Sequence, residues 1–251
     1  MLALHPLSTL GEVVPGDDLA RLLADAVQAA GLKPERHDVL MVTQKIVSKA
    51  EGRCVELAGI SPSPRALELA EITRKDPRFV ELVLAESVAV LRAVPNVLIT
   101  RHRTGHVMAN SGIDRSNTGP DGNGKVLLLP IDSDASAKRL RAALSAHWPN
   151  PPAVVISDSF GRPWRYGVTN VAIGASGLPA LLDRRGETDR NGRKLEVTQV
   201  ALGDMIATAG GLVTGEGAES IPAVLICGLR WTAADQPASA LVRPLEEDLF
   251  Q

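Results

Sequence analysis

Hydrophobic positions recur at helical spacing in three stretches of the chain, and each stretch carries polar residues suited to a helix end. Residues 17–31 (DDLARLLADAVQAAG) begin with acidic side chains, repeat apolar positions every three or four residues and end in glycine. Residues 76–92 predict a second helix, in which Pro77 suits the first turn. Residues 133–148 predict a third, whose early Ser and Asp residues suit an N-cap.

Apolar runs rich in β-branched residues have a different pattern and predict strands in four segments: 38–53, 96–100, 125–132 and 152–167. The first of these runs gives way to Lys45, Lys49 and Arg53, so we expect a strand that delivers cations to its end. Several of these runs are apolar throughout, which is typical of strands buried on both faces of a sheet.

The remaining segments are polar or rich in glycine: 61–66 and 104–124 predict loops, 189–194 predicts a turn, and 167–183 is rich in glycine without a predicted element. Residues 195–231 predict a helix, a glycine-rich loop and a strand. Helices and strands therefore alternate irregularly, which predicts an α+β or α/β protein and not a regular doubly wound sheet. With 251 residues and no repeat or low-complexity linker, we expect a single domain over 1–251, or two interlocked subdomains.

The composition is that of an ordinary soluble globular protein, with 45% hydrophobic and 22% charged residues. A formal net charge of -2 argues against binding to nucleic acid or to an anionic membrane surface. The N-terminal residues have no basic region or cleavage pattern, and no apolar run reaches 18 residues, so we expect a cytoplasmic protein. The distant Cys54 and Cys227 argue against a disulfide framework or a thiolate zinc site.

Two predicted strands lead to aspartates with hydroxyl or amide neighbours. The first is followed by Asp114 and the second by Asp158 and Ser159. Such oxygen-rich ends suit Mg²⁺ or Mn²⁺, but an aspartate that only caps a turn explains each position about equally well. Glu216 is a possible third carboxylate ligand, although a glutamate on the surface is the commoner case.

Arginines and aromatic residues are concentrated after the last of these strands. Only 3% of the chain is aromatic, yet Phe160, Trp164 and Tyr166 lie within seven positions, together with Arg162 and Arg165. Guanidinium groups beside metal-binding carboxylates suit a polyphosphate, and the aromatic rings suit a flat heteroaromatic ligand. A solvated basic rim and packing under a loop are the alternatives.

A glycine-rich segment, 209–220 (AGGLVTGEGAES), is a weak candidate for a phosphate-binding loop. Backbone N–H groups in such a loop can hold a phosphate. The segment is neither a Walker A motif nor GxGxxG, and the chain contains no GK[ST] sequence.

Taken together and in order, these segments resemble the family of coenzyme F420-0:γ-glutamyl ligases. The resemblance covers nearly the whole chain, and its most specific parts are VMANSGIDRSN and SDSFGRPWRYGVTNVAIGASGL. It implies a GTP-dependent ligase that adds L-glutamate to coenzyme F420-0, a deazaflavin, through an acyl phosphate. It also implies an intertwined homodimer with an α+β fold of mixed sheets and flanking helices. The implied cations are Mg²⁺ or Mn²⁺, with K⁺ as a further candidate.

The resemblance also implies roles for individual residues. The implied metal ligands are Asp114, Asp158, Ser159 and Glu216. The implied nucleotide contacts are His5, Pro6, Leu7, Ser8, Gln44, Lys49, Asn117 and Gly215. The residues implied to stabilise the transferring phosphoryl group are Lys49, Arg162 and Arg165.

Two other functions are kept as alternatives. One is a related nucleotide-dependent ligase that joins a different amino acid or a different acceptor carboxylate. The other is a non-catalytic nucleotide- or metal-binding module. The presence of Asp114, Asp158 and the Ser159 hydroxyl argues against the second, because a degenerate copy should have lost at least one of them.

Overall fold

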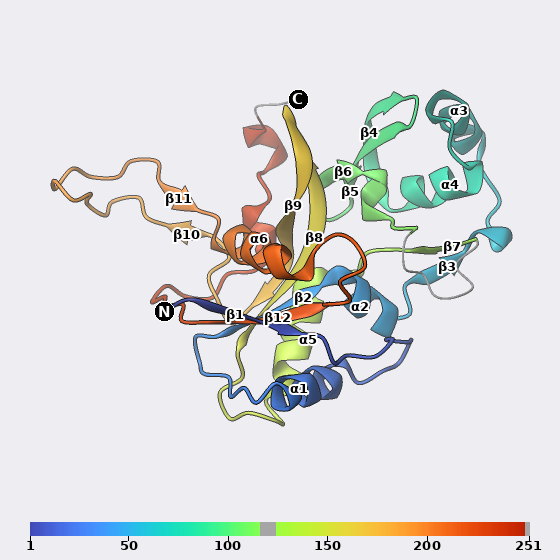
Figure 1. Cartoon of the computed structure of the whole chain (residues 1–251). Coiled ribbons are helices and arrows are strands. Elements are labelled where there is room, and N and C mark those ends of the chain that lie inside the picture. The colour runs from blue at the N-terminus through green and yellow to red at the C-terminus, as the bar shows by residue number, and fades with distance from the viewer. Residues whose placement is uncertain (116–123, 249–251) are drawn as a thin grey trace.

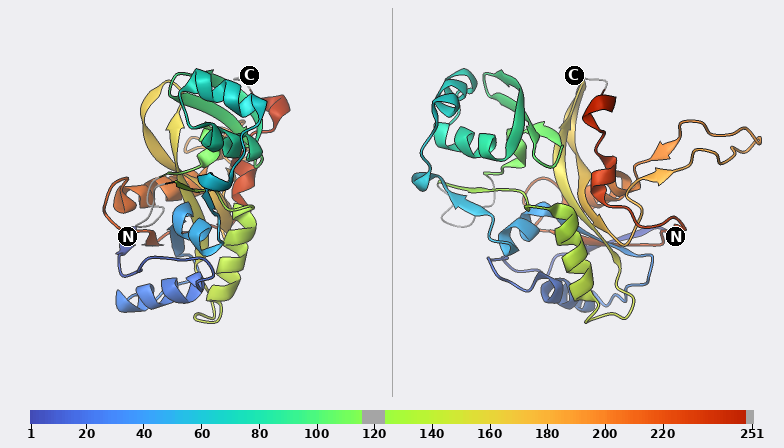
Figure 2. Two further views of the ribbon diagram at one scale, coloured as in Figure 1. Left: turned by 90° about the vertical axis from the view of Figure 1, so that its right-hand side faces the viewer. Right: turned by 180° about the vertical axis from the view of Figure 1, so that it is seen from behind.

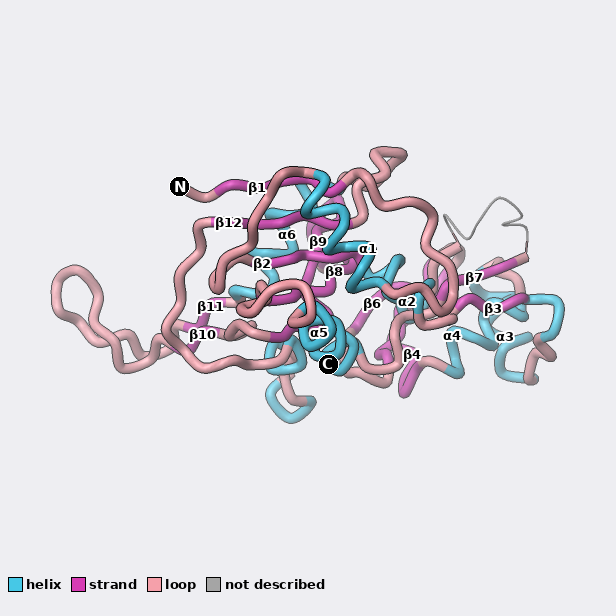
Figure 3. Tube along the Cα trace, turned by 90° about the horizontal axis from the view of Figure 1, so that it is seen from below, coloured by secondary structure: helices cyan, strands magenta, loops and turns pink. Residues whose placement is uncertain are grey.

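The computed structural model describes residues 1–115 and 124–248, and its centre is a five-stranded sheet. The strand order is β1 (Ala3–Leu7), β12 (Ala223–Cys227), β2 (Val39–Thr43), β8 (Ala153–Arg162) and β9 (Arg165–Ser176). Only β2 and β8 run parallel; the other neighbouring pairs are antiparallel. Figure 3 shows β1, β12, β2 and β8 side by side.

Helices cover both faces of this sheet, as expected for central strands that are apolar throughout. Along β2, Leu40 packs into the apolar cluster that includes α1 (Leu19–Ala29) and α5 (Ser133–Leu144). The next residue, Met41, packs on the opposite face against α6 (Leu202–Thr214). Both α1 and α5 begin at an aspartate whose side chain accepts a backbone hydrogen bond, so the helices predicted near 17–31 and 133–148 are confirmed.

The segment between α2 and α5 forms a lobe beside the sheet (Figures 1 and 2). Its sheet consists of β4 (Ser87–Val94), β5 (Val97–His102) and β6 (Val107–Ala109), and its helices are α3 (Pro64–Thr73) and α4 (Pro77–Ala85). A two-stranded sheet of β3 (Cys54–Glu56) and β7 (Lys125–Leu127) completes it. Phe79, Leu98 and Val126 belong to an apolar cluster of the lobe's own.

A long arm leaves the body near the end of β9 (Figure 1). Its base is the two-stranded sheet of β10 (Leu182–Asp183) and β11 (Gln199–Val200). The other short elements are the 3₁₀ turns η1 (Leu57–Gly59), η2 (Asn110–Gly112), η3 (Ala238–Leu241) and η4 (Leu245–Glu247). The mixed α+β class is therefore confirmed, and the intertwined homodimer stays a prediction.

The strand predicted over 38–53 is wrong in its second half. It ends at Thr43, and α2 (Gln44–Ala50) follows at once. Ile46 and Val47 are buried while Lys45 and Lys49 lie four residues apart, which is the spacing of one helical face. Lys45 and Lys49 thus lie on a short helix that follows the strand.

Two other predicted boundaries are also wrong, and one glycine-rich segment without a predicted element forms a strand. The helix predicted over 76–92 ends at Ala85, because the valine-rich residues that follow pair with β5 as strand β4. The loop predicted at 61–66 contains the start of α3, capped by Ser63. The glycine-rich segment 167–183 is largely strand β9, which pairs with β8 along most of its length. Among the described residues, no helix is long and apolar enough to span a bilayer.

Candidate functional site

A cavity of about 490 Å³ opens where the parallel pairing of β2 and β8 ends. The last parallel pair is Thr43 with Ser157, after which β2 leads into α2 and β8 continues toward its hairpin with β9. Ligands of sheet proteins commonly bind at the carboxyl ends of parallel strands. A larger cavity of about 780 Å³ lies beside α5, but none of the predicted site residues lines it. The chemistry is therefore concentrated at the smaller cavity.

The wall formed by β8 carries two of the predicted metal ligands. Asp158 is half-buried and Ser159 is exposed, and both line the cavity. They lie within β8 and not at its end, since the strand continues to Arg162. The Ser159 hydroxyl donates to the Glu216 carboxylate, with Oγ 2.7 Å from Oε1 and 2.9 Å from Oε2. The structure thus places Glu216 beside the two predicted metal ligands on β8, Asp158 and Ser159.

Two glycines allow α6 to bring Glu216 close to β8. A Cβ at Gly210 would lie 2.1 Å from the Met41 side chain, and one at Gly211 would lie 2.2 Å from Asn170. Because neither position has room for a side chain, the helix lies directly on the sheet. It ends at Gly215, whose positive φ of 66° turns the chain across the cavity.

Asp114 reaches this region from the lobe. Its carboxylate forms an ion pair with the Lys45 ammonium, with Oδ2 2.7 Å from Nζ. Its backbone is held by two hydrogen bonds with Leu127, one in each direction. Asn117, the predicted nucleotide contact in the same stretch, lies outside the described residues.

Burial and the neighbouring carboxylates affect Asp158 electrostatically. Desolvation raises the pKa of Asp158 to about 7, with further increases from the Asp114 and Glu216 charges. The Ser159 amide and the Lys45 ammonium act in the opposite direction and do not offset these effects. The charges of Asp114 and Glu216 therefore act on Asp158, and the positive charge of Lys45 does not offset their effect.

Two observations bear on whether a cation fits here. The donors are carboxylate and hydroxyl oxygens, the ligands that Mg²⁺ and Mn²⁺ prefer, and their negative charges are incompletely balanced. Within the described residues, however, no three His, Cys, Asp or Glu side chains are already grouped around one point. Asp114 instead contacts Lys45, and Glu216 contacts Ser159. The donor set fits a divalent cation if these side chains exchange their present partners for it.

The cavity also contains a buried hydroxyl suited to a ligand. Thr214 is 7% exposed and lines the cavity, yet its Oγ1 has no hydrogen-bond partner among the described residues. A buried unpaired hydroxyl is costly, which favours a partner that comes from a bound molecule.

The predicted nucleotide contacts divide into two groups. Gln44, Lys49 and Gly215 line the cavity. Gln44 is buried and accepts a hydrogen bond from Ser48, and the Lys49 ammonium pairs with Glu12 across the cavity wall.

The second group of predicted nucleotide contacts lies on or just after edge strand β1. None of its members is among the described residues that line the cavity: His5, Pro6, Leu7 and Ser8. The Leu7 side chain is buried in the core, so only its backbone is available to a ligand.

The predicted Arg162 and Arg165 lie at the tip of the β8–β9 hairpin and not at the cavity. They are paired with each other across the hairpin, and both are exposed. Trp164 and Tyr166 on the same tip are also exposed, at 82% and 103%. The described structure therefore separates this aromatic and basic tip from the carboxylates, and the catalytic role of its arginines stays a prediction.

Lys45, Glu12 and Thr214 are among the lining residues that the sequence analysis does not assign to the site. Lys45 is indicated in the sequence as a cation that follows an apolar run. Glu12 carries no such signal, because a lone glutamate in a loop is a common surface residue. Thr214 is marked only by its place in the weak candidate loop 209–220.

Comparisons with known proteins agree on one family. The family model described as F420-0:Gamma-glutamyl ligase matches residues 9–228. A protein of Methanopyrus kandleri named coenzyme F420:L-glutamate ligase is 44% identical over 254 residues, which cover 100% of this chain and 98% of that protein. Proteins of the same name from Natronomonas pharaonis and Methanothermobacter thermautotrophicus are 46% and 42% identical, and the matches cover 95% and 94% of this chain and 90% and 93% of those proteins.

Proposed function

The chain belongs to the F420-0:gamma-glutamyl ligase family, and from that premise we propose that it is a GTP-dependent ligase that adds L-glutamate to coenzyme F420-0. The observation that carries the proposal is the match to ligases over the full chain, combined with the group of oxygen donors and lysines at one cavity. The proposed acceptor, amino acid and nucleotide go beyond what family membership alone establishes.

The proposed reaction has two steps, because a free carboxylate does not react with an amine. The terminal carboxylate of F420-0 first attacks the γ-phosphorus of GTP, which forms an acyl phosphate and releases GDP. The amine of L-glutamate then attacks the acyl carbon, an amide bond forms, and inorganic phosphate leaves. The nitrogen loses its proton in this second step, so the products are the extended coenzyme, GDP, phosphate and a proton.

The side chains at the cavity suit this sequence. Asp114, Asp158, Ser159 and Glu216 would hold a divalent cation, which neutralises phosphate charge when it is bound. Lys45 and Lys49 lie on one helical face at the same cavity, where their ammonium groups would stabilise negative charge on the phosphoryl group in transfer. Both lysines now contact carboxylates, so the polyphosphate would compete with Asp114 and Glu12 for them.

The glycine-rich turn after α6 would contribute backbone donors. The Gly217 N–H donates to the Glu219 carboxylate at 2.8 Å, so this turn already holds a negatively charged group. A Cβ at Gly215 would lie 2.2 Å from the same carboxylate, which leaves room only for glycine. A phosphate oxygen has the charge needed to replace the carboxylate on such a donor.

Mass spectrometry of the product tests the proposal. The protein is incubated with F420-0, L-glutamate, GTP and Mn²⁺, alongside Asp158→Ala and the control Asp25→Ala, which removes an exposed carboxylate from α1. We expect a glutamate-sized mass gain that requires GTP, disappears in Asp158→Ala and persists in Asp25→Ala. GTP turnover without this mass gain would point to a different acceptor or amino acid. Equal product from wild type and Asp158→Ala would contradict the site.

A further inference from the structure

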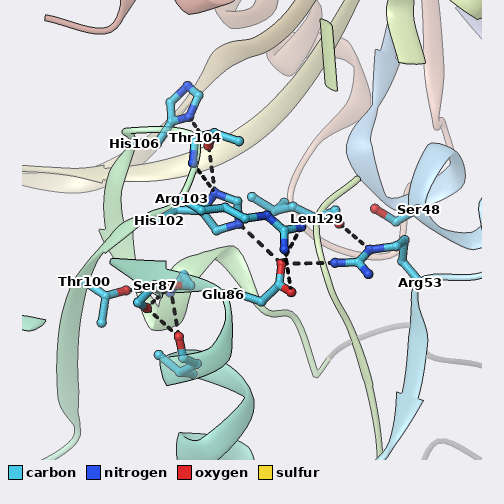
Figure 4. Close-up of polar contacts among 12 residues, drawn as sticks. Ser48, Arg53, Glu86, Ser87, Thr100, His102, Arg103, Thr104, His106 and Leu129 are labelled. Carbon is cyan, nitrogen blue, oxygen red and sulfur yellow. Dashed lines mark hydrogen bonds and ion pairs between the residues drawn. The ribbon is translucent and has the colours of Figure 1, made fainter. Parts of the chain in front are cut away.

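A second charged cluster lies at the junction between the lobe and the central sheet, outside the cavity. Glu86 follows α4, is 7% exposed, and binds two guanidinium groups (Figure 4). Its Oε2 lies 3.0 Å from Nη2 of Arg53 and 3.0 Å from Nη2 of Arg103. The reactions proposed above use none of these three residues.

Arg53 connects this carboxylate to two segments that lead to the cavity. Its Nε donates to the Leu129 carbonyl at 2.8 Å, and its backbone carbonyl accepts from the Leu128 amide at 3.1 Å. Its backbone amide donates to the Ser48 carbonyl at 2.9 Å, next to Lys49 on α2. One side chain and its backbone therefore join α2, the segment 127–129 and the lobe.

The segment 127–129 is also the segment that holds Asp114. Leu127 exchanges two backbone hydrogen bonds with Asp114, at 3.0 and 2.8 Å. The Asp114 carboxylate in turn reaches Lys45 on α2. Both ends of the Lys45–Asp114 ion pair thus depend on segments that Arg53 ties together.

A chain of polar contacts links the same cluster to β8. His102 Nε2 lies 3.5 Å from the Glu86 carboxylate, and its Nδ1 lies 2.7 Å from the Thr104 hydroxyl. That hydroxyl is 2.9 Å from Nδ1 of His106, whose ring packs edge-on against Phe160, two residues after Asp158. Figure 4 shows Glu86, His102, Thr104 and His106 in this order.

We propose that Glu86 and Arg53 are positioning residues, which fix Asp114 on the lobe relative to Asp158 on the sheet and to the lysines of α2. The inference rests on the proposed function only in treating this cavity as the ligase site. Arg53 acts through the segment 127–129, and Glu86 acts by holding the Arg53 guanidinium. Neither residue lines the cavity.

A matched control is available on the same lobe. Arg101 binds Asp248 in the C-terminal segment, with Nη2 3.1 Å from Oδ2, and its side chain is 15% exposed against 17% for Arg53. This ion pair also connects the lobe to another part of the chain, but its strand neighbours do not include the segment 127–129. The Arg101 variant therefore shows what the loss of any lobe ion pair does, and the Arg53 and Glu86 variants show what the loss of the Arg53–Glu86 pair does.

Amide hydrogen exchange measured by NMR tests the positioning directly and needs no substrate. The variants are Arg53→Met, Glu86→Gln, the milder Arg53→Lys and the control Arg101→Met. We expect the amides of Asp114, Leu127 and Leu128 to exchange at least tenfold faster in Arg53→Met and Glu86→Gln, with a smaller increase in Arg53→Lys and none in Arg101→Met. Unchanged rates at these amides, or an equal increase over the whole chain, would overturn the proposal. If Arg53→Met does not fold, the other variants decide.

Kinetics provide a second readout. We expect Glu86→Gln and Arg53→Lys to lower kcat for ligation at least tenfold and to raise the Mn²⁺ concentration needed for half-maximal rate, while KM for GTP changes less than twofold. Unaltered kcat and Mn²⁺ dependence would overturn the inference. If the wild-type protein shows no ligation at all, the proposed function fails, and the exchange measurement still decides on the positioning role.

Discussion

The two charged clusters that contact the segment 127–129 differ in how their charges are balanced. At the lobe junction, burial acts to raise the pKa of Glu86, but hydrogen bonding by His102 and the charges of Arg53 and Arg103 hold it below its usual value. At the cavity, burial and two further carboxylates raise the pKa of Asp158 to about 7, and Lys45 does not offset them. At the lobe junction the protein's own cations balance the carboxylate charge, and at the cavity they do not.

This difference separates a structural role from a functional one. A buried carboxylate with two guanidinium partners holds the lobe in place, and it loses stability when a partner is removed. A carboxylate whose pKa is raised by burial and by neighbouring carboxylates, as for Asp158, is maintained at a cost to the folded protein and is common at functional sites. The comparison therefore predicts opposite results when the carboxylate is neutralised in each cluster.

The largest expected effect is on activity, at the cavity. Asp158→Asn keeps the shape of the side chain and removes a charge among like charges, so we expect the free energy of unfolding to stay the same or rise slightly. Loss of a metal ligand should lower kcat by a factor on the order of 10³, the equivalent of several kcal/mol of transition-state stabilisation. Steady-state kinetics and urea unfolding measure both. A variant that is active, or strongly destabilised, would contradict the comparison.

At the lobe junction, the expected effect is on stability. Glu86→Ala leaves Arg53 without its carboxylate partner in a largely buried position, and we expect a loss of about 3 kcal/mol in the free energy of unfolding. Urea unfolding of this variant beside the exposed Asp25→Ala provides the measurement and its control. A loss no larger than that of the control would show that the two clusters do not differ as described.

Next to this cluster, His106 should make stability depend on pH. Burial, with a smaller contribution from the His102 charge, lowers the pKa of His106 from 6.5 to about 4. The unfolded chain therefore binds a proton first as the pH falls, and stability present above pH 6.5 is lost between about 6.5 and about 4. The loss should reach at most about 3 kcal/mol.

The measurement for His106 is urea unfolding at several pH values in this range. His106→Leu should lack this component of the pH dependence, while His147→Leu, which replaces an exposed histidine, should retain it. The same pH dependence in wild type and His106→Leu would contradict the assignment.

The smallest expected changes in stability are at Thr214 and its control, Thr208. Because the buried Oγ1 of Thr214 has no partner in the described part of the chain and burying it is costly, Thr214→Val should raise the free energy of unfolding by about 1 kcal/mol. Thr208→Val, on the same helix, removes a hydroxyl that donates to the Asn170 carbonyl and should cost up to about 1 kcal/mol.

For the affinity of the protein for its ligand, we expect the larger effect at Thr214 and not at Thr208. Calorimetry with GTP and Mn²⁺ should show about tenfold weaker binding for Thr214→Val, as expected for one lost hydrogen bond, and no change for Thr208→Val. Equal affinity in wild type and Thr214→Val would remove Thr214 from the site.

The features that sequence could predict are local. The helix that starts after Asp18 is visible because capping and helical spacing coincide, and Asp158 and Ser159 are visible because they follow an apolar run. The ion pair of Lys45 with Asp114 joins residues on different elements, and no local pattern indicates it. The same holds for Arg53 with Glu86.

Local patterns also misplaced two features for identifiable reasons. Lys45 and Lys49 appeared to extend a strand, because the helical spacing of α2 covers only seven residues. Arg162 and Arg165 appeared to adjoin the carboxylates, because they follow Asp158 closely in sequence. The continued pairing of β8 with β9 carries them to the hairpin tip.

The most direct test of the central claim is a titration of the protein with Mn²⁺ in the presence of GTP, monitored by electron paramagnetic resonance. We predict that wild-type protein and Arg101→Met bind the ion with the same affinity, and that Asp158→Asn binds it at least a hundredfold more weakly. If Asp158→Asn binds Mn²⁺ as tightly as the wild type, the unbalanced carboxylates at the end of the β2–β8 pair are not the cation site.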